Sequence, residues 1–347
     1  MSRRLLIVSS IRWDYLWQRH QSLAVAAADE GWQVDFLQPH PRNARHALTY
    51  PLRRLRGQQF TQEHPHLHHN IRVLALKSWL RPRKLGPYDL ALVYIPDRLT
   101  EWFLRRARVG RVVYDAVLDW ASVPRTWFPP IGWRSSEQRL AELPRSAVTT
   151  DAPGMAAILA TRGIAATVVL PAADPPFIGL SHPPFNQRRA AALYFGSVRE
   201  ELDLRALAAL ANAGLPVDIV GRAEDPALEA ALARDGLSIR PPLPLDDLAA
   251  TAHTYRVLLL PYRGERARSL IPAKTWNCIA TGSWVITKGL TLPTVPNVIS
   301  TSSTKEFVDA VSHAMTAVPP TLDTPPTWRD RWHQILTARL VSRVVSS

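Results

Sequence analysis

The amino-acid sequence predicts an α/β protein made of two doubly wound domains, each with a parallel sheet between helices. Short apolar runs alternate with helix-like segments along most of the 347 residues, which is typical of parallel strands joined by helical crossovers. Five prolines lie between residues 171 and 184, and proline-rich segments are typical of extended linkers. The linker divides the chain into two α/β series of similar size.

The first series begins with a strand over residues 4–10, where Leu-Leu-Ile-Val is followed by polar residues. A helix is expected over residues 14–29, with apolar side chains on one side and Gly31 as its stop signal. Further strands are expected over residues 33–37, 71–75, 89–95, 111–115 and 147–150. The third of these is apolar nearly throughout, as in a strand buried on both faces.

The second series repeats the alternation after the linker. Strands are expected over residues 191–195, 217–220, 238–240, 257–260 and 284–287, and helices over 203–212, from 225 to before Gly236, and from Pro272 to Gly282. The predicted domains are a first α/β domain over 1–170, the linker over 171–185, a second α/β domain over 186–318 and a tail over 319–347. We expect ligands to bind in the cleft between the two domains.

Composition excludes several classes of protein. The chain is 46% hydrophobic, which excludes global disorder, and no uninterrupted apolar run is long enough to cross a bilayer. One cysteine, Cys278, excludes an internal disulfide and a multi-cysteine zinc site. The early end of the first apolar run argues against a signal peptide, so the sequence predicts a cytoplasmic protein.

Positive charge is concentrated in one segment. The net charge is +13, and residues 40–85 hold ten Lys or Arg against Glu63 alone. Such a block attracts nucleic acid, anionic lipid headgroups or phosphorylated glycans, and the alternative is a solvated arginine-rich surface. Leucines interleave with the basic residues near the middle of the block, which suits an anionic interface and is clearest around Arg53, Arg54 and Arg56. Its six histidines lack well-placed carboxylate or Cys partners, so no metal site is expected.

The second domain carries the clearest candidate for ligand chemistry. No GxGxxG, Walker A or GxSxG pattern occurs, so dinucleotide, P-loop and serine-hydrolase functions lose their main support. Pro272 starts an expected helix and Lys274 falls in its first turn, where a cation beside exposed amides suits a diphosphate. Asn277 lies on the same face, within reach of a ribose hydroxyl. The alternative is a helix with a surface lysine.

This segment resembles the nucleotide-sugar motif of GT-B glycosyltransferases, and of the family-four-like group in particular. The motif's Pro-x-Lys, its Ala-x-Gly and its final Val-Val correspond in register to Pro272, Lys274, Ala280, Gly282, Val285 and Ile286, while its Glu and Tyr fall on Asn277 and Cys278. Segments 17–24, 113–120, 170–177 and 194–204 resemble the same family in the same order. The resemblance covers residues 4 to 315, and 328–339 is the candidate for a C-terminal helix that crosses back onto the first domain.

The resemblance implies that residues 1–170 form an acceptor-binding domain and residues 186–318 a donor-binding domain, and it implies two sets of site residues. The donor-binding set is Lys274, Arg199, Asn277, Gly196, Glu265 and Gly282. Asp119 is the first candidate for the general base of an inverting transfer, and Asp115 is the second. The alternatives are that Asp119 only caps a turn, that His20 is the base, or that the enzyme is retaining and needs no protein base. Acceptor-side candidates are Trp13, Asp14, Trp17 and Arg19.

The expected function is therefore transfer of a hexosyl group from a nucleotide diphosphate sugar to a hydroxyl of a lipid-linked or cell-surface glycan, as in polysaccharide biosynthesis. The nucleotide sugar is a co-substrate, and no cofactor or metal is expected. The expected partners are an anionic membrane surface, met peripherally at its inner face, or an anionic glycan. The alternatives are a glycosyltransferase acting on modified nucleic acid and a non-catalytic GT-B-like protein that binds polyanions.

Overall fold

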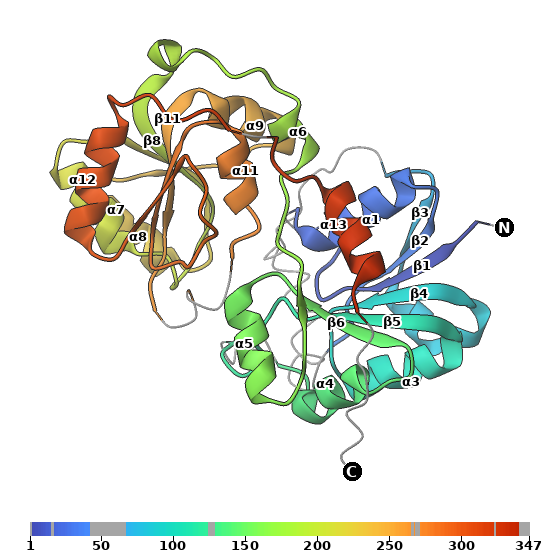
Figure 1. Cartoon of the computed structure of the whole chain (residues 1–347). Coiled ribbons are helices and arrows are strands. Elements are labelled where there is room, and N and C mark those ends of the chain that lie inside the picture. Colours follow the sequence, from blue (N-terminus) through green and yellow to red (C-terminus); the bar gives the residue numbers. More distant parts are fainter. Residues whose placement is uncertain are drawn as a thin grey trace. The chain divides into compact units, whose positions relative to one another are not determined.

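The computed structural model describes residues 2–14, 17–41, 67–123, 129–264, 267, 271–322 and 324–339. The chain divides into two compact units (Figure 1). Unit 1 comprises Met1–Leu170 together with Trp328–Ser347, and unit 2 is Pro171–Thr327. Each unit has one parallel sheet with helices between its strands, so the predicted α/β class is confirmed.

The described part of unit 1 contains a seven-stranded sheet in the order β3-β2-β1-β4-β5-β6-β7. Its strands pair in parallel and lie where apolar runs occur in the sequence, with Leu5 to Val8 of β1 fully buried. Their bounds are Arg4–Val8 (β1), Gln33–Leu37 (β2), Ile71–Leu74 (β3), Tyr88–Val93 (β4), Val109–Asp115 (β5), Ser146–Thr150 (β6) and Thr167–Val168 (β7).

Helices connect these strands. The described α-helices of unit 1 are Arg19–Asp29 (α1), Arg98–Ala107 (α3), Trp133–Ala141 (α4), Pro153–Thr161 (α5) and Trp328–Thr337 (α13), and two 3₁₀ helices are Leu76–Leu80 (η1) and Pro82–Lys84 (η2). The expected start of the first helix at Asp14 is wrong, because Gln18 forms a capping box with Gln21 and α1 begins at Arg19.

The C-terminal helix α13 packs against α1 in unit 1, where the two ribbons lie side by side (Figure 1). The ring of Trp332 meets that of Trp32 edge to face, with centroids 5.3 Å apart. Arg329 and His333 both approach Glu30, at 2.6 and 2.8 Å. The end of the chain therefore completes the surface of the unit in which the chain begins.

Unit 2 has a six-stranded sheet in the order β10-β9-β8-β11-β12-β13. Its strands are Arg189–Val198 (β8), Val217–Ala223 (β9), Ile239–Arg240 (β10), Tyr255–Pro261 (β11), Trp284–Lys288 (β12) and Val298–Thr301 (β13). Its described helices are Pro175–Ile178 (α6), Leu204–Asn212 (α7), Pro226–Arg234 (α8), Leu245–His253 (α9), Thr275–Ala280 (α11) and Thr304–Ala314 (α12), with a 3₁₀ turn at Phe185–Gln187 (η4). The predicted linker segment thus falls within unit 2 and contains α6, which packs against α9 and α11.

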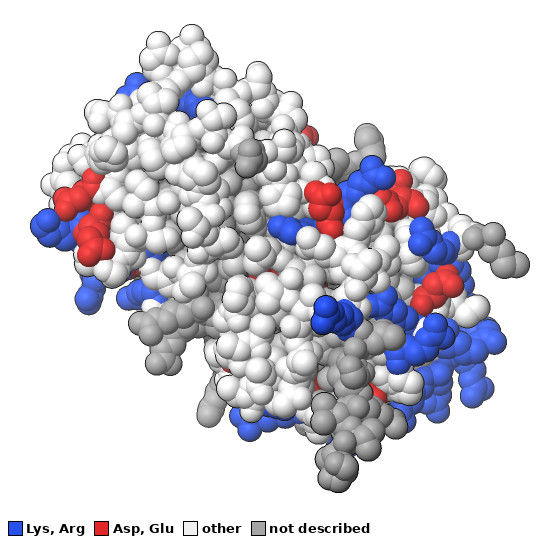
Figure 2. Space-filling view, viewed as in Figure 1, with Lys and Arg blue, Asp and Glu red and all other residues white. Residues whose placement is uncertain are grey.

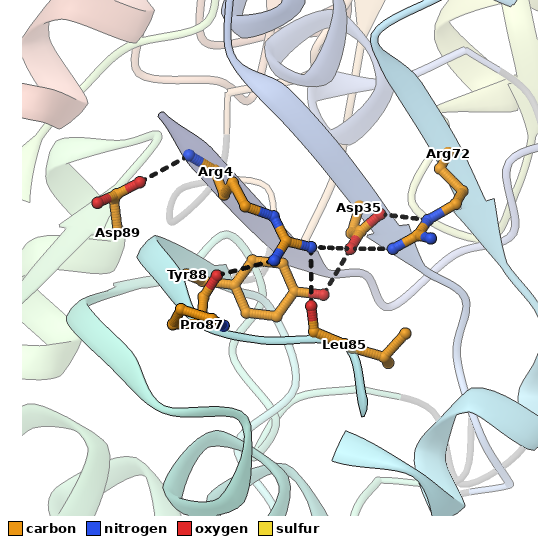
Figure 3. A network of polar contacts seen from close by, with 7 residues as sticks. All are labelled: Arg4, Asp35, Arg72, Leu85, Pro87, Tyr88 and Asp89. Carbon is orange, nitrogen blue, oxygen red and sulfur yellow. Dashed lines mark hydrogen bonds and ion pairs between the residues drawn. The ribbon is translucent and has the colours of Figure 1, made fainter. Parts of the chain in front are cut away.

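A buried carboxylate links four strands of unit 1. Asp35 of β2 accepts hydrogen bonds from Arg72 of β3, at 2.7 Å to each oxygen, and from the Tyr88 hydroxyl of β4 at 2.6 Å. Arg4 of β1 approaches it at 3.3 Å, and Figure 3 shows the two guanidinium groups on opposite sides of the carboxylate. Burial and the bond to Asp35 raise the pKa of Tyr88. The network fixes β1 to β4 in register at one place.

Candidate functional site

The strand order of unit 2 reverses between β8 and β11. From β8 the chain runs to β9 and β10 on one side of the sheet and afterwards to β11, β12 and β13 on the other. Doubly wound sheets bind ligands outside the carboxyl ends of the strands at this reversal. Lys274 lies here, because its ammonium group donates to the carbonyl oxygen of Phe195 near the end of β8. It also lies 3.7 Å from the ring centroid of Tyr194.

Two glycines open the backbone beside this lysine. Gly196 has a φ of +118°, and a Cβ there would lie 3.0 Å from Lys274 Nζ. Gly221 of β9 has a φ of +156°, and a Cβ there would lie 1.9 Å from the Gly196 carbonyl oxygen. A side chain at Gly196 would crowd the Lys274 ammonium group, and one at Gly221 would clash with the backbone of Gly196.

The environment of Lys274 favours an anion. Burial lowers the pKa of Lys274, to about 7 in total; the nearby Cys278 opposes this shift, and the positive charge of Arg199 makes a smaller contribution in its favour. Arg199 pairs with Glu224 at 2.6 Å. Among the described residues no carboxylate forms an ion pair with Lys274. A bound phosphate would supply the missing negative charge and restore the protonated form.

Lys274 differs from its predicted position in one respect. Helix α11 begins at Thr275, so Lys274 precedes the helix as its N-cap, and the expectation that it lies in the first turn is wrong. A turn closed by the bond from Thr275 N to Pro272 O, 2.9 Å long, occupies the residues expected to be helical. The ammonium group, rather than the amides of a six-residue helix, is therefore the candidate anion-binding element.

The other predicted donor residues take different positions. The amide of Asn277 is buried and forms two bonds with Asp174, at 2.7 Å to its backbone nitrogen and 2.8 Å to its carboxylate. Gly282 ends the turn after α11 with a φ of +64°, against the His182 ring. Glu265 lies outside the described residues. The structure thus brings Lys274, Arg199 and Gly196 together, while Asn277 ties α11 to the start of α6.

In unit 1 the corresponding reversal lies between β1 and β4. Ser9, directly after β1, forms a 2.8 Å hydrogen bond with His20 Nδ1. The His20 ring stacks on Tyr94, directly after β4, with centroids 3.6 Å apart. His20 is therefore fixed at the edge of the sheet where a doubly wound domain presents its ligand-binding groups.

Both predicted aspartates lie near the end of β5. Asp115 is fully buried and accepts from Arg19 at 2.7 Å and from Thr149 at 2.7 Å. Asp119 accepts from the backbone of Ala121 at 3.1 Å and forms an ion pair with Arg162. The contacts of Asp119 are those of the turn-capping alternative, and those of Asp115 fix the guanidinium group of Arg19.

One carboxyl group at this edge has no motif in the sequence to mark it. Asp151 directly follows β6, and its buried Oδ1 accepts no hydrogen bond from any residue the structure describes. Burial raises the pKa of Asp151 to about 7; the charge of Asp115 adds to the rise and that of Arg19 opposes it. A carboxyl group that titrates near neutrality suits proton transfer. Asp151 is recognised by its burial beside a second carboxylate, and the sequence does not reveal that burial.

The remaining acceptor-side candidates lie around the segment after β1. The Trp13 ring meets Phe36 and Trp17 edge to face, with centroids 5.0 and 6.0 Å away, and Trp17 donates to Ser22 Oγ at 2.7 Å. Asp14 pairs with the guanidinium group of a neighbouring arginine. The predicted polyanion-binding residues Arg53, Arg54 and Arg56 lie outside the described residues.

Among the described residues, no group of three or more His, Cys, Asp or Glu is placed to hold a metal ion. No helix in the described ranges combines the length and apolarity needed to cross a membrane.

Comparison with known proteins gives matches of structure only. No protein-family model and no curated protein matches the chain. Among solved structures, an α-glucosyltransferase in complex with UDP-glucose and DNA containing an abasic site is 9% identical with a TM-score of 0.62, over 96% of this chain and 93% of that one. A glycosyltransferase from Rickettsia africae ESF-5 is 8% identical with a TM-score of 0.55 (97% and 94% covered), and the apo structure of OtsA is 10% identical with a TM-score of 0.53 (96% and 94% covered). These neighbours are GT-B glycosyltransferases, and the chain therefore has the GT-B fold.

Proposed function

We propose that the protein is a glycosyltransferase that moves a hexosyl group from a nucleotide diphosphate sugar to a hydroxyl of a lipid-linked or cell-surface glycan. The observation that supports this most directly is the position of Lys274 at the strand reversal of unit 2, beside Gly196 and Arg199. The match of Pro272 and Lys274 to the family-four-like motif, and the UDP-glucose in a structural neighbour, point to the same donor.

The chemistry of sugar transfer assigns a role to the cations of unit 2. The acceptor oxygen attacks the anomeric carbon while the bond from that carbon to the diphosphate oxygen breaks, and the electron pair leaves with the nucleoside diphosphate. Lys274 and Arg199 would stabilise the charge that develops on this leaving group. The donor is a co-substrate, and the residues named supply the charge without a metal ion, so we expect EDTA to leave transfer unchanged.

Donor binding can be tested by calorimetry with UDP, GDP and ADP and their sugars. Loss of a charge-assisted phosphate contact is worth about 1.5–3 kcal/mol, so Lys274→Met should bind the preferred nucleotide roughly tenfold to hundredfold more weakly. Lys305→Met is the matched control, since Lys305 is 88% exposed on α12 and pairs only with Asp309 at 2.9 Å. Equal affinities in the two variants would contradict the donor site. Failure of every nucleotide to bind the wild type would favour a non-catalytic polyanion-binding protein.

For an inverting transfer, we propose that Asp151 is the base, in place of Asp119 and Asp115. Asp119 is held by Arg162 and a backbone amide, and Asp115 by Arg19 and Thr149, whereas one oxygen of Asp151 has no hydrogen-bond partner among the described residues. Asp151→Asn should slow transfer by at least about a hundredfold with nucleotide affinity unchanged, and Asp119→Asn should not. If Asp119→Asn slowed transfer and Asp151→Asn did not, Asp119 would be the base. Unchanged turnover in both variants would indicate His20 or a retaining mechanism.

A second candidate acceptor is modified nucleic acid. The structural neighbour with UDP-glucose also holds DNA, and the net charge of this chain is +13. Assays of sugar transfer to hydroxymethylated duplex DNA and to undecaprenyl-linked acceptors, run side by side, decide between the two. Transfer to DNA alone would overturn the glycan acceptor and, with it, the expected cytoplasmic face of the membrane as the place of action.

A further inference from the structure

The helices η1, η2 and α3 of unit 1 form one layer with a common outer surface. The Trp79 ring of η1 meets the Phe103 ring of α3 edge to face, with centroids 5.2 Å apart, and both rings are buried. Gly86, just after η2, lies so close to the end of α3 that a Cβ would be 1.7 Å from the Ala107 carbonyl oxygen. The inner sides of the three helices are thus fixed against one another, and their remaining sides face solvent.

Positive side chains cover that outer surface. Residues 75–108 contain eight Lys or Arg, and all eight are exposed. We call this set the cationic face: Lys77, Arg81, Arg83, Lys84, Arg98, Arg105, Arg106 and Arg108. Figure 2 shows Lys and Arg gathered on the side of unit 1 that carries α3.

The acidic residues of the same segment do not neutralise this face. Glu101 is buried and pairs with Arg139 at 2.7 Å, and Asp97 is buried as the N-cap of α3. Asp89 accepts from the backbone nitrogen of Arg4 at 2.7 Å. No carboxylate among the described residues forms an ion pair with any member of the cationic face. Two of the three carboxylates in residues 75–108 are thus buried, and the exposed Asp89 is bonded to the backbone, while all eight cations are exposed.

Apolar side chains lie among the cations. Leu80 is 79% exposed at the end of η1, and Leu76 and Leu99 are 43% and 38% exposed. In a 3₁₀ helix side chains three residues apart share a face, so Leu80 lies on the same face of η1 as Lys77. Exposed leucines gain nothing from a phosphodiester backbone, but they gain free energy on entering the boundary between headgroups and acyl chains. The combination favours a bilayer over nucleic acid.

We propose that the cationic face, with Leu76, Leu80 and Leu99, is the surface by which unit 1 docks on an anionic phospholipid membrane. It belongs to unit 1, whereas the candidate donor-binding residues belong to unit 2. The inference deepens the proposed function, on which it rests for the identity of a lipid-linked acceptor, by naming the surface at which that acceptor is met. The surface consists of described residues and does not depend on Arg53, Arg54 or Arg56.

Flotation with vesicles of phosphatidylcholine, alone or mixed with phosphatidylglycerol, tests this at about 0.1 M salt, where surface charges still act over ~10 Å. The wild type should bind the mixed vesicles only. Because each basic residue near the surface contributes about 1 kcal/mol, Arg81→Glu with Lys84→Glu should weaken binding at least about thirtyfold. Arg205→Glu with Arg234→Glu, two exposed arginines of unit 2, carries the same charge change as a control and should bind nearly as the wild type does. Leu80→Ser should weaken binding roughly tenfold with the charge intact.

Several outcomes would overturn the proposal. The proposal would be wrong if the wild-type protein did not bind the mixed vesicles. It would also be wrong if the two double variants lost vesicle binding to the same extent. If the protein bound duplex DNA at the same salt but did not bind vesicles, and if Leu80→Ser left DNA binding unchanged, the cationic face would be a nucleic-acid-binding surface. Nucleotide binding measured on the same preparations separates these failures from failure of the proposed function, since a donor site that works beside an inert surface contradicts only the docking proposal.

Discussion

Replacing Lys274 with methionine should stabilise the ligand-free protein even though it weakens nucleotide binding. The pKa of Lys274 is about 7 in the folded protein against an ordinary 10.5. At pH 7 the native state therefore holds half a proton at this site, whereas the unfolded chain holds a whole one. This difference costs about 4 kcal/mol of folding free energy. Methionine is similar in length and has no charge to bury. After loss of the bond to the Phe195 carbonyl and of the contact with the Tyr194 ring, a net gain of about 2 kcal/mol remains.

The pH dependence distinguishes this cause from better packing. Because the folded pKa is lowered, the unfolded state binds more protons between pH 7 and 10.5, and wild-type stability should rise with pH through that window. The slope approaches about 1.4 kcal/mol per pH unit, and Lys274→Met should lack it. Cys278 acts in the opposite direction above about pH 9, since burial raises its pKa to about 12, so the comparison is made below that pH.

Urea unfolding of the wild type and of Lys274→Met between about pH 7 and pH 8.5 measures both effects. The difference in unfolding free energy should be largest at pH 7 and should shrink steadily as the pH rises. Nucleotide binding to the wild type should take up protons in the same window, because a phosphate favours the charged lysine. A variant less stable than the wild type at pH 7, or parallel pH profiles, would refute the assignment of a desolvated ammonium group at this site.

Three further predictions concern the fold around the site. Asp35→Asn should lower the free energy of unfolding by about 2–3 kcal/mol in urea titrations, because two guanidinium groups lose their buried counter-charge, and a change below about 0.5 kcal/mol would contradict this. His253, whose pKa burial lowers to about 4, bonds to His182 at 3.2 Å. Wild-type stability should therefore fall as pH drops from 6.5 toward 4, and a His253→Gln variant with the same slope would exclude this origin. Gly221→Ala should yield unfolded or insoluble protein, since its Cβ would lie 1.9 Å from a carbonyl oxygen; soluble protein with native near-ultraviolet circular dichroism would contradict that steric argument.

The strands were predictable wherever burial leaves a continuous apolar run. The predicted strand over residues 33–37 matches β2 at both ends, because the polar or turn-forming residues that end it are its neighbours in the sequence. Two short edge strands were not predicted: β7, of two residues, and β13, of four. They form because they pair with a neighbouring strand, and their own residue pattern does not indicate a strand. The sequence also placed the start of α11 too early, because a proline permits a turn as readily as a helix start.

The candidate site was predictable only in its motifs. Lys274 could be selected because its spacing from Pro272 is local in sequence. Asn277 shows the limit of that approach: its pairing with Asp174 spans 103 positions along the chain and is set by packing. Asp151 was missed for the same reason, since its unusual pKa arises from burial and from Asp115, which lies on another strand.

Helix α13 makes unit 2 an insertion within unit 1. The chain enters unit 2 at Pro171 and leaves it at Thr327, and these two ends run side by side, joined by a bridge between Ala173 and Thr327. During synthesis, unit 2 is complete before the ribosome has made the last helix of unit 1, although unit 1 was begun first. The side of α1 that α13 covers must therefore remain exposed to solvent or bound by a chaperone until α13 has been synthesised. For the same reason residues 171–327 form a natural unit for separate expression, whereas unit 1 can be isolated only by joining Leu170 directly to Trp328.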